Sequence, residues 1–240
     1  MSAPGSSGMM SFAITRSAAP VRTQIEEYLR QEILNGYLRP GTRLIERELC
    51  NHLKVSRTSL REALRHLEDR GLVQNIPQKG LVVATMTLAE AEEIYQISGV
   101  VTAWSVRVFS ERASSQQRLA LQETVADFEA ALHAGDVRQL AEAKGRFATL
   151  LVVGSGNRTM STIAGTLQDR VTLLRRLNMA QPDWPTQSLD QMRRILAAVL
   201  AGDGDSAAQA CIEHAQSAAK VAAQAWRWTE AETVAKKIQS

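Results

Sequence analysis

The chain has 240 residues, 45% of them hydrophobic and 22% charged, which is the composition of a folded globular protein of one or two domains. This composition excludes wholesale disorder and collagen-like structure, and no apolar run approaches the roughly 18 residues that a membrane helix needs. Its two cysteines, Cys50 and Cys211, lie far apart. They favour free thiols in a reducing cytoplasm over a disulfide framework.

The positive charge is concentrated in the first third of the chain. Residues 20–85 contain eleven Lys and Arg against eight Asp and Glu, whereas residues 86–240 contain sixteen against seventeen. A local excess of this kind is compatible with binding a polyanion. Residues 1–19 are rich in Ser, Gly and Ala and lack the apolar segment of a signal peptide, so we expect a disordered leader there.

Apolar residues at helical spacing predict three helices in the basic segment, at residues 21–35, 46–53 and 57–70. Ser56 is expected to cap the third helix, and Gly71 is expected to end it. Two β-type runs follow at residues 72–76 and 81–84, and Pro77-Gln78-Lys79-Gly80 lies between them. This arrangement predicts a hairpin with a basic turn.

From residue 88 onward the pattern predicts helices only. Their expected ranges are 88–113, 115–134, 136–153, 157–180, 186–201 and 204–236. Thr87 precedes the first of them as a candidate N-cap. The sequence therefore predicts an all-helical second domain.

The third predicted helix carries the candidate DNA-reading residues. Arg57, Arg61 and Arg65 recur every four residues on a face separate from the apolar stripe. A guanidinium fork can bind guanine O6 and N7 together, or a phosphate. Thr58 and Ser59 add hydroxyl groups for phosphate contacts at the helix N-terminus.

The alternative is a solvated amphipathic helix whose arginines pair with Glu62 and Glu68. The order of elements favours DNA binding, because a short helix, a tight turn, a second helix and a hairpin follow one another as in a winged helix-turn-helix. Lys79 and Gly80 form the tip of that hairpin. A glycine without a side chain allows the tip to approach the DNA backbone or the minor groove closely.

This segment resembles the GntR family of bacterial repressors. The resemblance rests on residues 33–44 (ILNGYLRPGTRL), on Glu46 to Leu49, and on residues 55–64 (VSRTSLREAL), and it spans nearly all of residues 21–84. It implies DNA contacts by one arginine in the second helix, two in the recognition helix, the wing tip and a phosphate-contacting pair. The matching residues are Arg47, Arg57, Arg61, Lys79, Gly80, Thr58 and Ser59.

The second half resembles the FCD bundle of the FadR subfamily. Phe147 followed by Ser155-Gly156-Asn157, and the run from Ile195 to Val199 before Gly202-Asp203, carry this likeness. The fold class expected is mostly α: an N-terminal winged helix-turn-helix domain with a small β-hairpin wing, then a C-terminal all-α helical bundle. The expected domains are residues 20–85 for DNA binding and residues 86–240 for effector binding and dimerisation.

Many FCD bundles hold a divalent metal with one acidic residue and three histidines. Matched by position, these ligands fall on Lys144, Ala148, Met192 and His214. One imidazole cannot form such a site, and Lys144 would repel a metal ion if it pointed inward. We therefore expect no metal and no other cofactor. For His214, a structural histidine with its hydrogen bonds satisfied is the preferred interpretation.

The family's Arg and Glu in the first bundle helix fall on Ser98 and Thr102, which makes the expected pocket less charged. Together with the missing metal ligands, this favours a larger or more apolar effector. Arg146, Arg170 and Arg175 are candidates for holding it, and surface ion pairing is the alternative for all three. Met192 and His214 are further candidate pocket residues.

The sequence therefore predicts a ligand-responsive transcriptional regulator. Two copies would bind an inverted-repeat DNA operator, and a small metabolite in the bundle would change DNA affinity; in the family, ligand usually relieves repression. One alternative is a regulator whose degenerate bundle serves only dimerisation. An enzyme is disfavoured because the chain has no phosphate loop, no dinucleotide-binding turn and no His-Glu-x-x-His motif. A nucleoid structural protein would not need the long helical domain.

Overall fold

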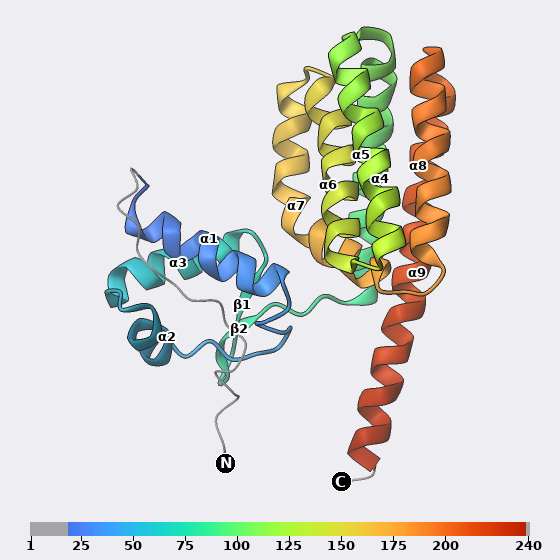
Figure 1. The fold of residues 1–240 in the computed structure, drawn as a ribbon. Helices are drawn as coiled ribbons and strands as arrows, with labels where there is room; N and C mark the ends of the chain where they lie inside the picture. Colours follow the sequence, from blue (N-terminus) through green and yellow to red (C-terminus); the bar gives the residue numbers. More distant parts are fainter. Residues whose placement is uncertain (1–18, 239–240) are drawn as a thin grey trace. The chain divides into compact units, whose positions relative to one another are not determined.

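The computed structural model describes the backbone of residues 19–238 and the side chains of residues 19–225 (Figure 1). Apart from Ala19, the leader predicted at residues 1–19 lies outside this range. The chain divides into two compact units, residues 1–86 and 87–240. The described residues form nine helices and one two-stranded sheet, which confirms the mostly α fold class.

The first unit holds three helices and a hairpin. Its elements are α1 (Val21–Leu34), α2 (Glu46–Leu53), α3 (Arg57–Asp69), β1 (Val73–Ile76) and β2 (Gly80–Val83). α3 packs on α1, on α2 and on β1. Buried leucines and isoleucines fill the space between the helices: Ile25, Leu29, Leu49, Leu53, Leu60, Leu64 and Leu67. Their burial confirms the predicted apolar faces.

Local capping sets the ends of α3 as predicted. The Ser56 hydroxyl accepts a hydrogen bond from the Ser59 backbone N–H at 3.1 Å. After the helix, Gly71 adopts a φ of +68°, a left-handed conformation that glycine takes without steric cost. Between α2 and α3, Lys54 also has positive φ, at 53°, and makes the turn between the two helices tight.

The hairpin is antiparallel, and Val73 pairs with Val83 while Ile76 pairs with Gly80. β2 therefore begins one residue before the predicted start, because Gly80 already pairs across the hairpin. The other edge of β2 pairs with the chain between α1 and α2, where Arg43 forms an isolated antiparallel β-bridge with Val82. This third extended segment anchors the wing to the helical core.

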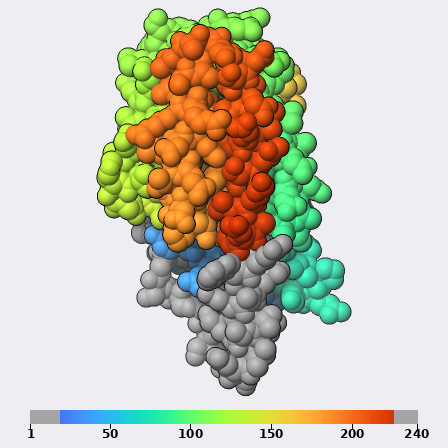
Figure 2. All heavy atoms as spheres, turned by 90° about the vertical axis from the view of Figure 1, so that its right-hand side faces the viewer, coloured from blue at the N-terminus to red at the C-terminus, as the bar shows by residue number. Residues whose placement is uncertain are grey.

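The second unit is a bundle of six helices, with α8 and α9 side by side on one face (Figure 2). They are α4 (Leu88–Arg112), α5 (Ser115–Ala134), α6 (Val137–Gly154), α7 (Arg158–Met179), α8 (Trp184–Ala201) and α9 (Gly204–Ile238). α8 begins two residues earlier than predicted, because Pro185 is accommodated in its first turn. None of the helices in the described part of the chain is long and apolar enough to cross a membrane.

α4 lies at the centre of the bundle and packs on α6, α7, α8 and α9. Thr87 caps it in a reciprocal capping box with Glu90. Gly99 allows α4 and α9 to approach closely, since a Cβ atom there would lie only 2.7 Å from the Cβ of Ala215. Three buried phenylalanines, Phe109, Phe128 and Phe147, are among the largest side chains of the bundle core.

Candidate DNA interface and effector cavity

The face of α3 opposite its leucine stripe is open to solvent. Arg57, Thr58 and Arg61 are exposed, and Ser59 is half-buried beside the N-cap. Thr58 and Ser59 lie in the first turn, where backbone N–H groups without helical partners favour an anion. Exposed guanidinium groups and a helix end that favours an anion therefore share one surface.

Arg61 has a specific partner within the first unit. Its Nε donates to both carboxylate oxygens of Glu46 on α2, at 3.0 and 2.9 Å. The partner is thus neither Glu62 nor Glu68, the residues of the solvated-helix alternative. Among the described residues, no group hydrogen-bonds to the two terminal nitrogens of Arg61, so they are available to a base edge. Arg47 and Arg57 are exposed and form no ion pair within the described part of the chain.

The wing tip offers a second basic surface. Lys79 is exposed, and Gly80 has a φ of +79° with nothing within 4 Å of the position of a Cβ atom. Gln78, at the centre of the turn, also has positive φ. The tip is therefore narrow and unobstructed, and its only charge is positive.

Replacing Lys79 with alanine is expected to weaken binding to all DNA sequences about equally, because an ammonium group contacts phosphate rather than bases. Each lost phosphate contact should flatten the slope of log K against log salt by about 0.9. Titrations at several salt concentrations measure this, with Lys220→Ala, an exposed lysine of the second unit, as the control. An unchanged slope for Lys79→Ala would show that the wing tip makes no phosphate contact through Lys79.

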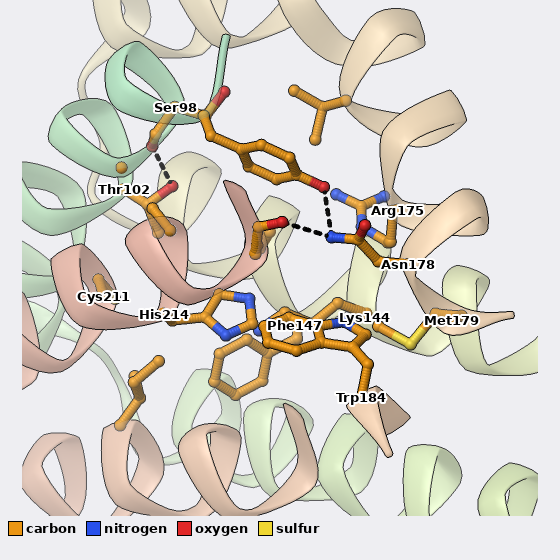
Figure 3. Close-up of a pocket in the computed structure, with 17 residues that line it drawn as sticks. Ser98, Thr102, Lys144, Phe147, Arg175, Asn178, Met179, Trp184, Cys211 and His214 are labelled. Atoms are coloured by element: carbon orange, nitrogen blue, oxygen red, sulfur yellow. Dashed lines mark hydrogen bonds between the residues drawn. The ribbon is translucent and has the colours of Figure 1, made fainter. Parts of the chain in front are cut away.

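The second unit contains two neighbouring cavities, each partly open to solvent. One of about 90 Å³ lies among α4, α6, α7, α8 and α9 (Figure 3). The other, of about 350 Å³, lies among α4, α6 and α7. Both are lined by Ser98, Thr102, Ala148, Val171 and Arg175. The shared residues place the two cavities directly against each other.

Four of the candidate pocket residues line these cavities: Ser98, Thr102, Arg175 and His214. Arg146 does not, because it lies two residues beyond Lys144 and so about 200° around α6. Its side chain is 51% exposed and pairs with Asp127 at 2.8 Å, as in the surface alternative. Arg170 and Met192 are also absent from the cavity walls, and Met192 is buried in the core instead.

His214 is held by contacts within the protein. Its ring stacks on Trp184 at 5.4 Å between centroids, and its Nδ1 lies 2.6 Å from the side-chain oxygen of Gln191. Because an amide oxygen only accepts, Nδ1 carries the proton. Burial lowers the pKa of His214 well below 6.5, so the ring is neutral. These contacts are those of a structural histidine that also forms part of the cavity wall.

The cavity does not have the donor set of a divalent metal site. Lys144 is only 6% exposed and lines the cavity at the position of the family's acidic ligand, with Ala148 one turn later. No lining residue is Asp or Glu, and no group of three or more His, Cys, Asp or Glu residues suited to a metal occurs among the described residues. A single imidazole beside an ammonium group does not fit such an ion.

Comparisons with known proteins agree with a winged helix-turn-helix in the first unit and a helical bundle in the second. The family model for bacterial regulatory proteins of the gntR family matches residues 21–83, and the FCD domain model matches residues 93–217. The chain belongs to the GntR family. It is thus a transcriptional regulator with an FCD domain, and not an enzyme.

Relatives of this GntR regulator include the HTH-type transcriptional regulator YdhC of Bacillus subtilis, 28% identical over 196 residues that cover 81% of this chain and 88% of the relative. The transcriptional repressor RspR of Escherichia coli is 27% identical over 82% of this chain and 86% of its own length. A GntR regulator from Rhodococcus sp. RHA1 has the same fold, with a TM-score of 0.75 at 22% identity over 85% of this chain and 97% of the other.

Two cavity residues of this GntR regulator, Tyr95 and Asn178, are not indicated by any pattern in the sequence. Asn178 Nδ2 donates to the Tyr95 hydroxyl at 2.8 Å and to the Ala218 carbonyl at 3.0 Å (Figure 3). Tyr95 and Asn178 are 83 residues apart, so no local pattern connects them. For Lys144, in contrast, the sequence indicates a charge that would repel a metal ion if it pointed inward, and this residue interrupts the apolar row of α6 between Leu140 and Phe147.

Proposed function

We propose that this regulator binds an inverted-repeat operator as a homodimer, and that a small metabolite in the bundle cavity changes its affinity for DNA. The observation that carries the proposal is a cavity with polar groups inside the bundle of a chain that also has an exposed guanidinium face on α3. The effector shifts DNA binding only by its differential affinity for the DNA-bound and free arrangements. Since RspR is named a repressor, repression is the proposed sense. Its place in the cytoplasm and its relief by the effector follow the usual behaviour of the family that the sequence resembles.

An exposed apolar stripe on α4 supports pairing of two copies. Ile97, Val100 and Trp104 are 51%, 62% and 41% exposed. Their spacing of three and four residues places them on one face of the helix. Contiguous apolar surface on a soluble domain is typical of a protein–protein contact. A dimer also supplies the two recognition helices that an inverted repeat requires.

Sedimentation of the wild-type chain at micromolar concentration should give about twice 26.3 kDa. Val100→Glu is expected to yield a monomer, because it places a charge in the centre of the stripe at a site already open to solvent. Leu119→Glu, at a similarly exposed leucine of α5, is the matched control and should stay dimeric. A wild-type monomer, free and on DNA, would contradict the proposed mechanism.

Selection from a pool of random-sequence duplexes tests the function itself. The full chain should enrich an inverted repeat whose half-sites are about one or more helical turns apart. Enrichment of a single half-site, or of no sequence, would contradict the proposal. Melting curves with a metabolite panel address the dimerisation-only alternative, since a ligand that binds only the folded state raises its stability.

A further inference from the structure

Two buried cations share the smaller cavity. Lys144 on α6 and Arg175 on α7 are 6% and 9% exposed, and both line it (Figure 3). Gly145, the neighbour of Lys144, leaves room for the guanidinium group: a Cβ atom there would lie 2.9 Å from Arg175 Nη1. The glycine therefore allows the guanidinium group to lie directly against α6.

No acidic side chain in the described part of the chain pairs with these two cations. Neither cavity has an Asp or Glu in its walls. Within the described residues, neither the Lys144 ammonium nor the Arg175 guanidinium group has a hydrogen bond or an ion pair. The Phe147 ring, 5.0 Å from Lys144 Nζ, offers a cation–π contact. That contact offsets only part of the cost of burying unpaired positive charge.

We propose that the cavity binds a small organic monocarboxylate, with its carboxylate between Lys144 and Arg175 and its apolar part against Phe147 and Trp184. The inference rests on the proposed function and identifies the chemical class of the effector. A lysine in place of the acidic metal ligand gives the site a covalently attached positive charge, and no metal is needed to hold the anion. Arg175 adds a fork that matches a carboxylate in geometry.

The remaining walls fit the same class of ligand. The Ser98 hydroxyl lacks a partner among the described residues and can donate to an oxygen anion. The other wall residues are mainly apolar, among them Val171, Met179 and Ile195, which disfavours a highly hydrated dianion such as phosphate. At roughly 10–15 Å³ for each water-sized group, the smaller cavity of about 90 Å³ holds about six to nine non-hydrogen atoms, and the adjoining cavity of about 350 Å³ leaves room for a longer apolar part. Hexanoate and benzoate fit the smaller cavity, so the ligand proposed is more apolar, as the sequence favours, rather than larger.

Anion binding at this site should be coupled to proton uptake. Burial lowers the pKa of Lys144 to about 7; Cys211 opposes this shift, and Arg175 adds a smaller repulsion that lowers the pKa further. The other groups that face Lys144 are Tyr95 of α4 and Cys211 and His214 of α9. Burial raises the pKa of Tyr95 and of Cys211 and lowers the pKa of His214, so all three side chains are neutral at pH 7. From α8 only Trp184 and Ile195 line the cavity. A bound carboxylate stabilises the ammonium form, so affinity should fall up to tenfold per pH unit above pH 7.

Isothermal titration of the full chain in EDTA tests the proposal with hexanoate, benzoate, the matched amides and inorganic phosphate. We expect the acids to bind at least tenfold more tightly than the amides or phosphate, and more weakly at pH 8.5 than at pH 7. Lys144→Met and Arg175→Met should each lose at least tenfold in affinity. Arg146→Met, at an exposed arginine of the same helix, should bind like the wild type. Lys144→Gln replaces Lys144→Met if the latter does not fold.

Amides that bind as well as acids, a preference for phosphate, unchanged binding by Lys144→Met, or no binding of either acid would overturn the carboxylate site. Operator binding by the same proteins separates this result from the proposed function. If the wild type binds its selected operator but no carboxylate, only this inference fails. If it binds no operator, the proposed function fails, whatever the titrations show.

Discussion

Replacing both Arg57 and Arg61 with alanine is expected to lower affinity for the selected operator by roughly 2–6 kcal/mol per half-site, because each bidentate contact to guanine contributes about 1–3 kcal/mol. Binding to random DNA should fall much less, since it depends on phosphate contacts that Arg47, Thr58 and Lys79 can still make. Gel-shift titrations on operator and random duplexes measure both quantities. The ratio of the two affinities is the informative number.

The matched control removes the same charge elsewhere. Arg138 and Arg146 are two exposed arginines of α6 that form surface ion pairs with Glu142 and Asp127, and their double alanine variant should keep full operator affinity. Melting curves show whether each variant folds, which matters because Arg61 loses its pair with Glu46. A folded Arg57/Arg61 double variant with unchanged operator affinity would exclude α3 as the recognition helix.

Replacing Lys144 with methionine is expected to stabilise the ligand-free protein by about 1–4 kcal/mol near neutral pH, because an unpaired buried cation is replaced by an apolar side chain of similar length. The same substitution at Lys220, an exposed lysine of α9, serves as the control and should change stability by less than about 0.5 kcal/mol. Chemical denaturation measures the free energy of unfolding of all three proteins.

The pH dependence of this effect has a definite sign. The pKa of Lys144 is about 7 in the folded state and 10.5 ordinarily, so between these values the unfolded chain binds the proton and the folded chain does not. Stability of the wild type should therefore rise with pH above 7, by about 1.4 kcal/mol per unit at most. His214 adds a loss of stability below pH 6.5, because its folded-state pKa is lowered.

Between pH 7 and pH 9, the pH dependence of the free energy of unfolding is expected to come mainly from Lys144. Above pH 9 the Cys211 thiol opposes the trend, since burial raises its pKa to about 12 from 9.0 and the unfolded state loses the proton first. Across the window the wild type should gain about 2–3 kcal/mol, and Lys144→Met should gain little. A flat wild-type profile would show that the Lys144 ammonium group is not held in an apolar environment.

The sequence by itself determined the elements and the family. Helical spacing, Ser56 and Thr87 as N-caps, and the turn residues around Gly71 and Gly80 act within a few residues of the chain. Such local preferences can be read before any fold is known, and the helices end within a few residues of their predicted bounds. The DNA-facing side of α3 follows from the same periodicity, since its buried leucines fix which face remains exposed.

Only the tertiary structure decided which polar residues meet inside the bundle. Tyr95, Asn178 and Ala218 come together from α4, α7 and α9, and Arg175 faces the cavity whereas Arg146 faces solvent. The partner of Arg61 was also found only there, on α2, fifteen residues away. These contacts depend on the rotation and packing of whole helices, to which residues distant in sequence contribute jointly. The sequence therefore shows that Lys144 interrupts an apolar row, and the packed bundle shows that it lies beside Arg175 in a cavity without an acidic residue.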